Sequence, residues 1–523
     1  MRGGRSRRPC KAGGVIRPPR PDIQTVGIIG TGAMGRGIAQ IAAQAGLTVN
    51  LYDANPQAVE AARQYLQDTL DKLAAKGRIS PDDASATLAR VKPCGKLEDL
   101  AGCDAVVEAI VERLDVKRDL VAKLEAIVQP DAIIASNTSS LSITAIAVGA
   151  KHPGRIAGYH FFNPVPLMKV VEVIDGLSGD GAVGDALMEL SRRMGHTPVR
   201  CKDMPGFIVN HAGRGMNIEG LKVAQEGVAE YADIDDIMRE QAGFRMGPFE
   251  LMDLTGLDVS HPVMESIYSQ FYQEPRYRPS PIAALRSVGG LVGRKAGAGF
   301  YSYPDGRKTR PTPAAPAPAA RPKSVWVSRA CEHGHTLVTN LLSKLGTTPE
   351  TGTLPSADAL IVVTPLGLDA TSCALQEGLD ATRTVAVDTL LPFEATKRRT
   401  IMTTPATTAT DRDAAHGLFA SDGVPVTVIR DSAGFVGQRV ICSIVNIASD
   451  IAQQRIATPS DIDLAVNLGL GYPKGPLALG DAIGPQRILE CLRNLERLTG
   501  DMSYRPSPWL WRRAGLGLSL LWD

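Results

Sequence analysis

Residues 203–210 of this chain read DMPGFIVN, and residues 431–438, which lie 228 positions later (431 − 203), read DSAGFVGQ. The same spacing of 228 connects further matches: DID at 233–235 with 461–463, Gly247-Pro248 with Gly475-Pro476, Asp253 with Asp481, and Gly256 with Gly484. A YRPSP segment also recurs at 277 and 504, one residue out of step. Because the spacing stays constant over many matches, the sequence predicts an internal duplication.

Length and composition limit the class of protein. The 523 residues suffice for about three or four domains, and contents of 44% hydrophobic and 21% charged residues are typical of globular proteins. A net charge of +2 provides no field that favours nucleic acid as a partner. There is no apolar run long enough for a membrane span. The eight cysteines include no C-x-x-C pair, which predicts reduced thiols and a cytoplasmic protein.

The N-terminal segment 1–22 differs in composition from the rest of the chain. Its first twenty residues carry seven Lys or Arg and no acidic residue. Because the segment lacks an apolar helical face, we interpret it as a disordered basic tail rather than a transit peptide.

The segment from residue 23 to Asp53 predicts a dinucleotide-binding unit. A β run (Val26–Ile29) meets a loop of the form G-x-G-x-x-G, then an Ala-rich helical stretch and a second β run that ends at Asp53. The first glycine permits a tight turn, the second lets a pyrophosphate approach, and the third allows close packing of helix and strand. An acid after the second strand favours NAD over NADP. The predicted cofactor loop comprises Gly30, Thr31, Gly32, Ala33, Met34 and Gly35.

Further β runs lie at 104–111, 132–138, 155–162 and 168–174. They alternate with helical segments, except between the last two, and therefore predict a largely parallel sheet. His160 ends one of these runs, and Glu172 lies within the next. A carboxylate in an apolar run is costly unless it is paired, so an imidazole on the neighbouring strand is its expected partner. Such a pair can transfer protons. A hydrogen-bonded structural histidine fits the spacing equally well.

Two other features narrow the chemistry. Short-chain dehydrogenases need Tyr-x-x-x-Lys and zinc alcohol dehydrogenases need clustered cysteine ligands; both patterns are absent, and we expect no metal. In the helix predicted around 57–76, Thr69 and Lys76 share one face. They could hold a phosphate or pantetheine arm, or simply form a solvated face.

Five motifs resemble the L-3-hydroxyacyl-CoA dehydrogenase family: GTGAMGRGIAQ, VVEAIVERLDVK, ASNTSSLSI, HFFNPVPLMKVVEVI and DMPGFIVN. The resemblance covers residues 23–305. It implies that His160 is the acid/base, that Glu172 orients it, and that Ser139 and Asn210 hydrogen-bond the reacting oxygen. The substrate would be an L-3-hydroxyacyl-CoA.

The resemblance also implies contacts with the cofactor and with coenzyme A. The implied NAD contacts are Asp53, Glu112, Lys117, Asn137, Ser139, Asn163 and Lys295. Thr69 and Lys76 match family positions that contact coenzyme A. Residues 211–215, HAGRG, depart from the family pattern, because Gly213 and Gly215 weaken a helix where the family has an Arg/Leu-rich one.

The fold class expected is an α/β Rossmann domain, an all-α domain, and a degenerate second copy of both. The predicted boundaries are 23–201 for the NAD-binding domain, 202–308 for the helical substrate and dimerisation domain, 309–323 for a Pro/Ala linker, 324–430 for a Rossmann-like domain without a cofactor loop, and 431–523 for a second, non-catalytic helical domain. The β run at 324–328 lacks a following GxGxxG, and this half lacks a His–Glu pair. Gln438 replaces Asn210, so we interpret its side chain as free of a catalytic requirement.

We expect the two helical domains to form an internal pseudo-dimer, with further assembly into homo-oligomers left open. The two-copy layout resembles longer bacterial family members associated with phenylacetate breakdown or fatty-acid β-oxidation, which act on 3-hydroxyadipyl-CoA or 3-hydroxybutyryl-CoA. A terminal carboxylate needs a cationic partner, for which Arg214 is a candidate by position. Two alternatives stay open: a dehydrogenase of free hydroxy or sugar acids, and a non-catalytic NAD-binding relative such as a lens crystallin.

Overall fold

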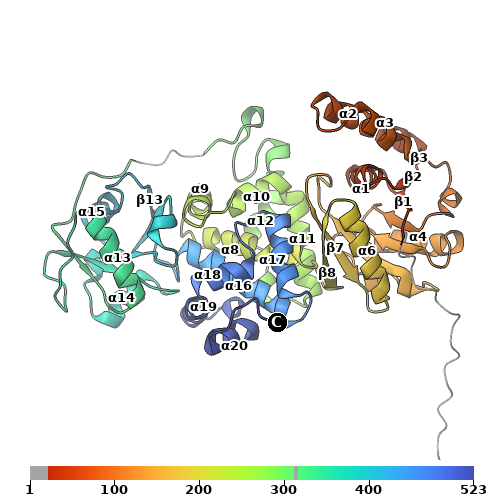
Figure 1. Cartoon of the computed structure of the whole chain (residues 1–523). Helices are drawn as coiled ribbons and strands as arrows, with labels where there is room; N and C mark the ends of the chain where they lie inside the picture. The colour runs from red at the N-terminus through yellow and green to blue at the C-terminus, as the bar shows by residue number, and fades with distance from the viewer. Residues whose placement is uncertain (1–21, 311–315) are drawn as a thin grey trace, which may run out of the picture. The chain divides into compact units, whose positions relative to one another are not determined.

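The computed structural model describes residues 22–310 and 316–523 of the chain. The predicted basic tail therefore lies outside the described residues except for Asp22, and so does part of the predicted linker. The chain divides into two compact units, one ending at Asp203 and one spanning Met204–Asp523 (Figure 1). No helix of the described residues is long and apolar enough to cross a membrane.

The first unit contains an eight-stranded sheet with the order β3-β2-β1-β4-β5-β6-β7-β8. Its strands are β1 (Thr25–Ile29), β2 (Thr48–Tyr52), β3 (Val91–Pro93), β4 (Ala105–Glu108), β5 (Ile133–Ser136), β6 (Ile156–Phe161), β7 (Val170–Asp175) and β8 (Thr197–Lys202). Its helices are α1 (Ala33–Gln44), α2 (Pro56–Ala75), α3 (Pro81–Ala89), η1 (Leu97–Leu100), α4 (Leu114–Ile127), α5 (Ile143–Ile146), η2 (Pro153–Arg155) and α6 (Gly181–Arg193).

All neighbouring strands of this sheet are parallel except β6 and β7, which run antiparallel. Residues of β4, β5 and β6 are buried throughout, as expected for strands covered on both faces. The antiparallel register places His160 directly opposite Glu172. The predicted Rossmann-like sheet is therefore confirmed, and β6 and β7 bring the expected imidazole and carboxylate onto adjacent strands.

The second unit begins with a helical region. Its elements are α7 (Val209–Ala212), α8 (Arg214–Gln225), α9 (Tyr231–Asp236), the π-helical turn η3 (Ile237–Gln241), α10 (Pro248–Thr255), α11 (Leu257–Gln270), η4 (Pro275–Tyr277), α12 (Pro281–Val288), η5 (Arg294–Ala296) and η6 (Pro304–Gly306).

A five-stranded sheet with the order β13-β12-β11-β10-β9 follows. Its elements are β9 (Ser324–Val327), α13 (Glu332–Lys344), β10 (Ala359–Val363), α14 (Ala370–Glu377), η7 (Ala381–Arg383), β11 (Thr384–Val387), η8 (Phe393–Ala395), β12 (Arg399–Thr403), α15 (Ala409–Phe419) and β13 (Val426–Ile429). From β9 to β13 the neighbours run parallel, parallel, antiparallel and parallel, the same succession as from β4 to β8. Within the described residues, this sheet has no strands in the places of β1, β2 and β3.

The chain ends in a second helical region. Its elements are α16 (Val436–Gln453), α17 (Pro459–Leu470), α18 (Pro476–Ile483), α19 (Pro485–Thr499), η9 (Met502–Tyr504) and α20 (Pro508–Leu516). Helix α16 is buried along nearly its whole length and packs against α8. At Gly215 an added Cβ would lie 2.8 Å from the Cα of Ile444, so glycine permits this close approach of the helices. Gly213 caps the break between α7 and α8. The departure of HAGRG from the family pattern thus has a packing reason.

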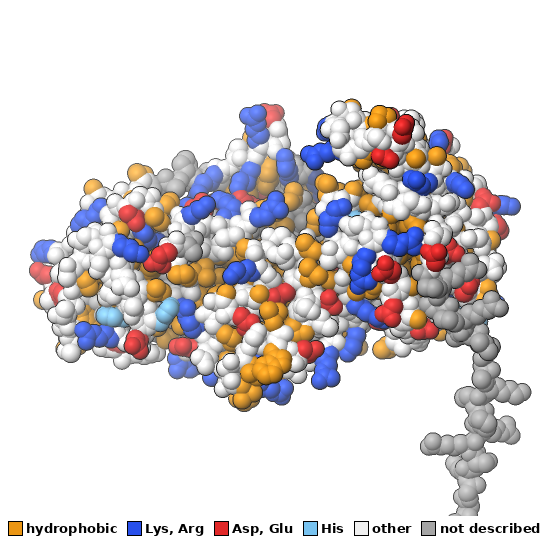
Figure 2. All heavy atoms as spheres, viewed as in Figure 1, with side chains coloured by type: hydrophobic (Ala, Val, Ile, Leu, Met, Phe, Trp, Pro, Cys, Tyr) orange, Lys and Arg blue, Asp and Glu red, His pale blue; other side chains and the backbone are white. Residues whose placement is uncertain are grey.

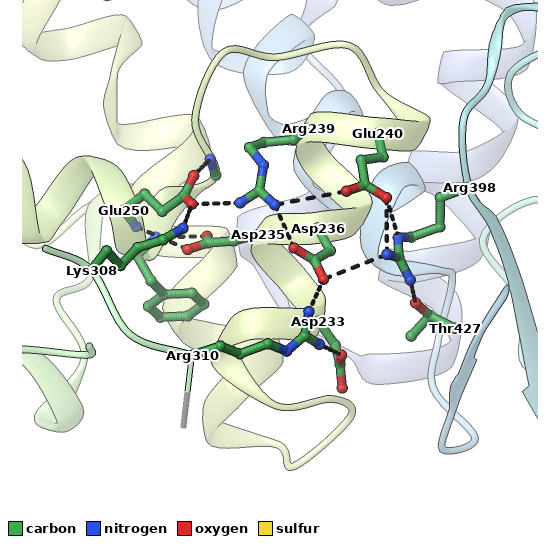
Figure 3. A network of polar contacts seen from close by, with 12 residues as sticks. Asp233, Asp235, Asp236, Arg239, Glu240, Glu250, Lys308, Arg310, Arg398 and Thr427 are labelled. Carbon is green, nitrogen blue, oxygen red and sulfur yellow. Dashed lines mark hydrogen bonds and ion pairs between the residues drawn. The ribbon is translucent and has the colours of Figure 1, made fainter. Parts of the chain in front are cut away.

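Ion pairs also join the first helical region to the second sheet (Figure 3). The guanidinium of Arg398 contacts Asp236 at 3.5 Å and Glu240 at 2.9 Å, and it donates to Thr427 on β13 at 2.9 Å. Arg310, at the end of the first described range, pairs with Asp236 from the other side. The second unit is therefore held together by polar as well as apolar contacts. On the face shown in Figure 2, basic and acidic side chains are interspersed.

Candidate active site

The glycine-rich loop lies between β1 and α1. Gly30 has a φ of +91°, and a Cβ there would lie 2.6 Å from the carbonyl oxygen of Ala109, while a Cβ at Gly35 would lie 1.7 Å from the oxygen of Gly30. Both positions require glycine. An added Cβ at Gly32, in contrast, would meet no atom within 4 Å. No side chain caps the N-terminus of α1, so the first turn, which includes Ala33 and Met34, presents amide groups to an anion.

A cavity of about 560 Å³ opens beside this loop, which is within the usual size of cofactor sites. The carboxylate of Asp53, at the end of β2, lines the cavity and accepts hydrogen bonds from the amide (2.8 Å) and hydroxyl (3.0 Å) of Thr31. Open space over Gly32, uncapped amides and an acid at the end of β2 fit a dinucleotide with a free ribose 2′-hydroxyl. The predicted loop and acid therefore meet at one cavity.

Glu112 organises the segment after β5. Its carboxylate accepts hydrogen bonds from the Thr138 hydroxyl (2.7 Å), the Ser139 amide (2.9 Å) and the Ser140 hydroxyl (2.9 Å). Burial acts to raise the pKa of Glu112, but the hydrogen bond from Thr138 and the charge of Lys117 outweigh it, so the pKa lies below its ordinary value. Glu112 is thus ionised at neutral pH and holds Ser139, which is half-buried.

Lys117 is only 1% exposed, and its ammonium binds the carboxylate of Glu108 at 2.8 Å and Glu112 at 3.5 Å. Ser136 donates a further hydrogen bond to Glu108. In this arrangement Lys117 positions Glu112, and its direct contact with NAD stays a prediction. Sequence reasoning missed Glu108; the available signal was an acid at the end of β4, nine positions before the lysine.

His160 and Glu172 form the pair that the strand pattern predicts. The Nδ1 atom of His160 lies 2.6 Å from Oε2 of Glu172, and the two residues are 5% and 0% exposed. Glu172 is therefore a buried carboxylate paired with an imidazole. Such a bond fixes the ring orientation and its tautomer, and it stabilises an imidazolium when one forms.

The remaining predicted residues of the first unit follow strands β5 and β6 or belong to helix α2 and its C-terminal cap. The amide oxygen of Asn137 accepts a hydrogen bond from the Phe161 amide at 2.9 Å, which ties the end of β5 to β6. Asn163 is exposed just after β6. Thr69 is half-buried on α2, and Lys76 is exposed at its C-terminal cap. The cofactor and coenzyme A roles of these residues stay predictions.

Asn210 and Lys295 belong to the second unit. Asn210 is half-buried on α7, and its carbonyl oxygen accepts a hydrogen bond from Nε of Arg214 at 2.8 Å. The ammonium of Lys295 binds Asp258 at 2.6 Å, with both side chains about half-exposed at 51% and 46%.

The positions 228 residues after Ser139, His160, Glu172 and Asn210 are Gly367, Asp388, Thr400 and Gln438. Gln438 is fully buried; its amide nitrogen donates to Asp388 at 3.0 Å and to the Pro365 carbonyl at 2.9 Å, while its oxygen accepts from the Gly367 amide at 2.8 Å. That Gln438 carries no catalytic requirement stays a prediction, and the structure gives its side chain a structural role. Its longer side chain reaches three partners that fix it in place.

Gln241, a residue of the first helical region, binds two of these four residues. Gln241 donates to Asp388 at 2.8 Å and accepts from the Thr400 hydroxyl at 2.5 Å. Burial raises the pKa of Asp388. The polar groups at these positions thus bond to one another. Among the described residues, no group of three or more His, Cys, Asp or Glu side chains could hold a metal ion.

Two family models match the chain. The model of the 3-hydroxyacyl-CoA dehydrogenase NAD-binding domain matches residues 25–204. The model of the 3-hydroxyacyl-CoA dehydrogenase C-terminal domain matches two segments, residues 206–303 and 434–518.

Individual relatives fall into long and short forms. A 3-hydroxyadipyl-CoA dehydrogenase of Escherichia coli K12 is 36% identical over 94% of this chain and 98% of its own length. A "Probable 3-hydroxybutyryl-CoA dehydrogenase" of Deinococcus radiodurans is 42% identical over 53% of this chain and 99% of its own length. The crystal structure of a 3-hydroxybutyryl-CoA dehydrogenase from Escherichia coli K12 superposes with a TM-score of 0.83 and 35% identity, covering 95% of this chain and 99% of that one.

Proposed function

We propose residue roles and a substrate class for this chain, which belongs to the 3-hydroxyacyl-CoA dehydrogenase family. The chain is an NAD-dependent oxidoreductase that converts the 3-hydroxyl group of an acyl-CoA into a keto group. The observation that carries the assignment of roles is the buried contact of 2.6 Å between His160 and Glu172.

In the proposed mechanism, Nε2 of His160 removes the hydroxyl proton of L-3-hydroxyacyl-CoA while the hydride of C3 departs. Bound NAD⁺ supplies the hydride acceptor. Glu172 keeps the proton of the neutral ring on Nδ1, so that Nε2 can accept, and it then stabilises the imidazolium. Ser139 and Asn210 donate hydrogen bonds to the oxygen as it becomes a carbonyl. Glu112 holds Ser139 in place through the amide contact described above.

We further propose that residues 324–523 are a duplicate that has lost the cofactor half of its sheet. The repeated strand directions and the two matches of one family model support this origin. So do matched helix caps: Asp235 accepts the amides of Phe249 (3.0 Å) and Glu250 (2.9 Å), and Asp463, 228 positions later, accepts those of residues 477 and 478, both at 2.8 Å. The domain limits 23–201, 202–308, 309–323, 324–430 and 431–523 are part of the proposal.

The second helical region takes the place of a partner subunit in this proposal, as an internal pseudo-dimer. Support comes from the packing of α8 on the buried helix α16. Removal of residues 309–523 would expose the apolar face of α8. We therefore expect that truncated form to aggregate or self-associate in sedimentation velocity, and a soluble monomer with full activity would contradict the pseudo-dimer. Sedimentation velocity of the whole chain also tests whether it assembles into homo-oligomers.

The proposed substrate is 3-hydroxyadipyl-CoA or 3-hydroxybutyryl-CoA, as the names of the long relatives suggest. A role in phenylacetate or fatty-acid breakdown is part of the proposal. Thr69 and Lys76 would contact the coenzyme A portion. We place the reaction in the cytoplasm, with support from the free thiols of the seven described cysteines.

NADH formation with purified enzyme tests this proposal. The panel contains L-3-hydroxyadipyl-CoA, L-3-hydroxybutyryl-CoA, and the corresponding free 3-hydroxy acids. We expect turnover of at least one thioester and none of the free acids. Turnover of free acids alone would overturn the assignment of the substrate class.

A further inference from the structure

Arg214 carries a buried positive charge that no acidic side chain of the described residues pairs with. It opens helix α8 and is only 6% exposed. Its Nε donates to the carbonyl of Asn210, but its Nη1 is buried and has no hydrogen-bond partner among the described residues. Burial lowers the pKa of Arg214 to about 10, so the guanidinium remains charged at neutral pH. Buried charges are normally paired, so this cation has an unmet need for an anion.

The groups around Arg214 do not supply that anion. The pKa of His211, one turn earlier, is lowered to about 3 by burial and by the charge of Arg214, so its ring is neutral. The hydroxyl of Tyr472 is buried without a hydrogen-bond partner among the described residues, and this tyrosine interacts electrostatically with Arg214. Burial raises the pKa of Tyr472, which keeps it protonated. His211 and Tyr472 are thus neutral neighbours of Arg214, and Tyr472 provides a second donor suited to a carboxylate.

We propose that Arg214 is the specificity-determining residue of this enzyme and binds the terminal carboxylate of a dicarboxylic 3-hydroxyacyl-CoA. This inference rests on the proposed function, because that function places the reacting oxygen at Asn210. In a six-carbon dicarboxylic chain, three carbon–carbon bonds separate C3 from the terminal carboxylate, a span of about 4 Å. The Nε atom of Arg214 lies 2.8 Å from the carbonyl oxygen of Asn210, so the guanidinium lies close to the residue that would hold the reacting oxygen.

Kinetics with two thioesters of equal chain length test the proposal. L-3-hydroxyadipyl-CoA and L-3-hydroxyhexanoyl-CoA differ only in a terminal carboxylate or methyl group. We expect the wild-type enzyme to prefer the adipyl thioester in kcat/KM. Arg214→Met should reduce that preference about 10²-fold, because a carboxylate would be left without its partner. Arg214→Lys should retain part of the preference, since it keeps the charge but loses the guanidinium geometry.

The matched control is Arg245→Met, which removes an exposed arginine that lies close to Gly471, the residue before Tyr472. It should leave the ratio of the two kcat/KM values unchanged. Thermal unfolding of each variant identifies any that fail to fold. If Arg214→Met does not fold, the ratio of the two kcat/KM values in Arg214→Lys tests the proposal. Equal losses on both thioesters in the Arg214 variants, or no preference in the wild-type enzyme, would overturn the inference while the proposed function stands. Absence of turnover with both of these thioesters and with L-3-hydroxybutyryl-CoA would instead overturn the proposed function.

Discussion

Two sets of four residues lie 228 positions apart in this chain and differ in their chemistry. The first set comprises Ser139, His160, Glu172 and Asn210, and the second comprises Gly367, Asp388, Thr400 and Gln438. In the first set, His160 and Glu172 form one buried contact of an imidazole with a carboxylate. In the second, the positions of the histidine and the glutamate hold Asp388 and Thr400. Gln241 enters between them from the first helical region. The first set is equipped to transfer a proton, whereas the second consists of amides, a hydroxyl and a carboxyl that bind one another.

The same contrast recurs between the helices of the two halves. His211 bonds the hydroxyl of Tyr277 at 2.6 Å, and Arg439, 228 positions later, bonds that of Tyr504 at 2.8 Å. The histidine is neutral, while the arginine also binds Glu219 of α8 and Glu226, which caps that helix. The comparison teaches that Asp388 and Arg439 bind side chains of the first helical region, which gives the second half a role in attachment.

The largest expected effect follows from removing the proton acceptor. His160→Gln should lower kcat by about 10²–10⁴-fold, because general base catalysis contributes that much. The affinity for NAD, measured by fluorescence titration, should change little, since the cofactor loop lies on other strands. Near-normal turnover would remove His160 from the mechanism and with it the contrast between the two sets.

Arg439 offers the sharpest test of attachment. It is fully buried, and its guanidinium binds Glu219 at 2.7 Å and Glu226 at 2.9 Å. Arg439→Met leaves these acids without their cation, so the free energy of unfolding in urea should fall by about 3–5 kcal/mol. The control is Lys222→Met. Lys222 pairs with Asp501, but both side chains are about one quarter exposed at 25% and 24%, and the loss should stay below about 1 kcal/mol. If both variants lose the same free energy of unfolding, burial does not determine how much these ion pairs stabilise the protein.

Local patterns predicted the first half well. The glycine spacing located the turn before α1. The succession of β runs placed His160 beside Glu172, because the two residues lie on adjacent strands. The buried Lys117–Glu108 pair was not predicted, since burial of a charge depends on packing that a local pattern does not encode.

The second half was predicted only in outline. Local patterns predicted the β runs of a second sheet, but they did not predict that its strand directions from β9 to β13 repeat those from β4 to β8. The partners of Gln438 were not predicted because they lie far from it in the sequence. Asp388, one of these partners, also binds Gln241, which lies 147 positions away in the chain. Contacts over such separations leave no trace in local periodicity.

A change within the second set should affect stability without affecting the reaction. Asp388→Ala removes the acceptor of the Gln241 and Gln438 amides, and unpaired buried donors cost about 1–3 kcal/mol. We expect chemical denaturation to report that loss, with kcat in native buffer unchanged. A fall in kcat comparable to that of His160→Gln would show that the second set takes part in catalysis.

The smallest effect concerns the dependence of stability on pH. Burial lowers the pKa of His211 to about 3, whereas an unfolded histidine titrates near 6.5. Below that value the unfolded chain binds a proton that the native chain does not, so stability falls as the pH decreases from about 7 toward 3. Between pH 7.5 and 5.5 the loss should be about 1 kcal/mol. His211→Gln should remove this part of the pH dependence in urea titrations, whereas Arg439, its counterpart, stays charged throughout and should add none. An unchanged pH profile in the glutamine variant would show that His211 titrates in the native state as it does in the unfolded chain, and the two halves would then both carry a cation at this position at acidic pH.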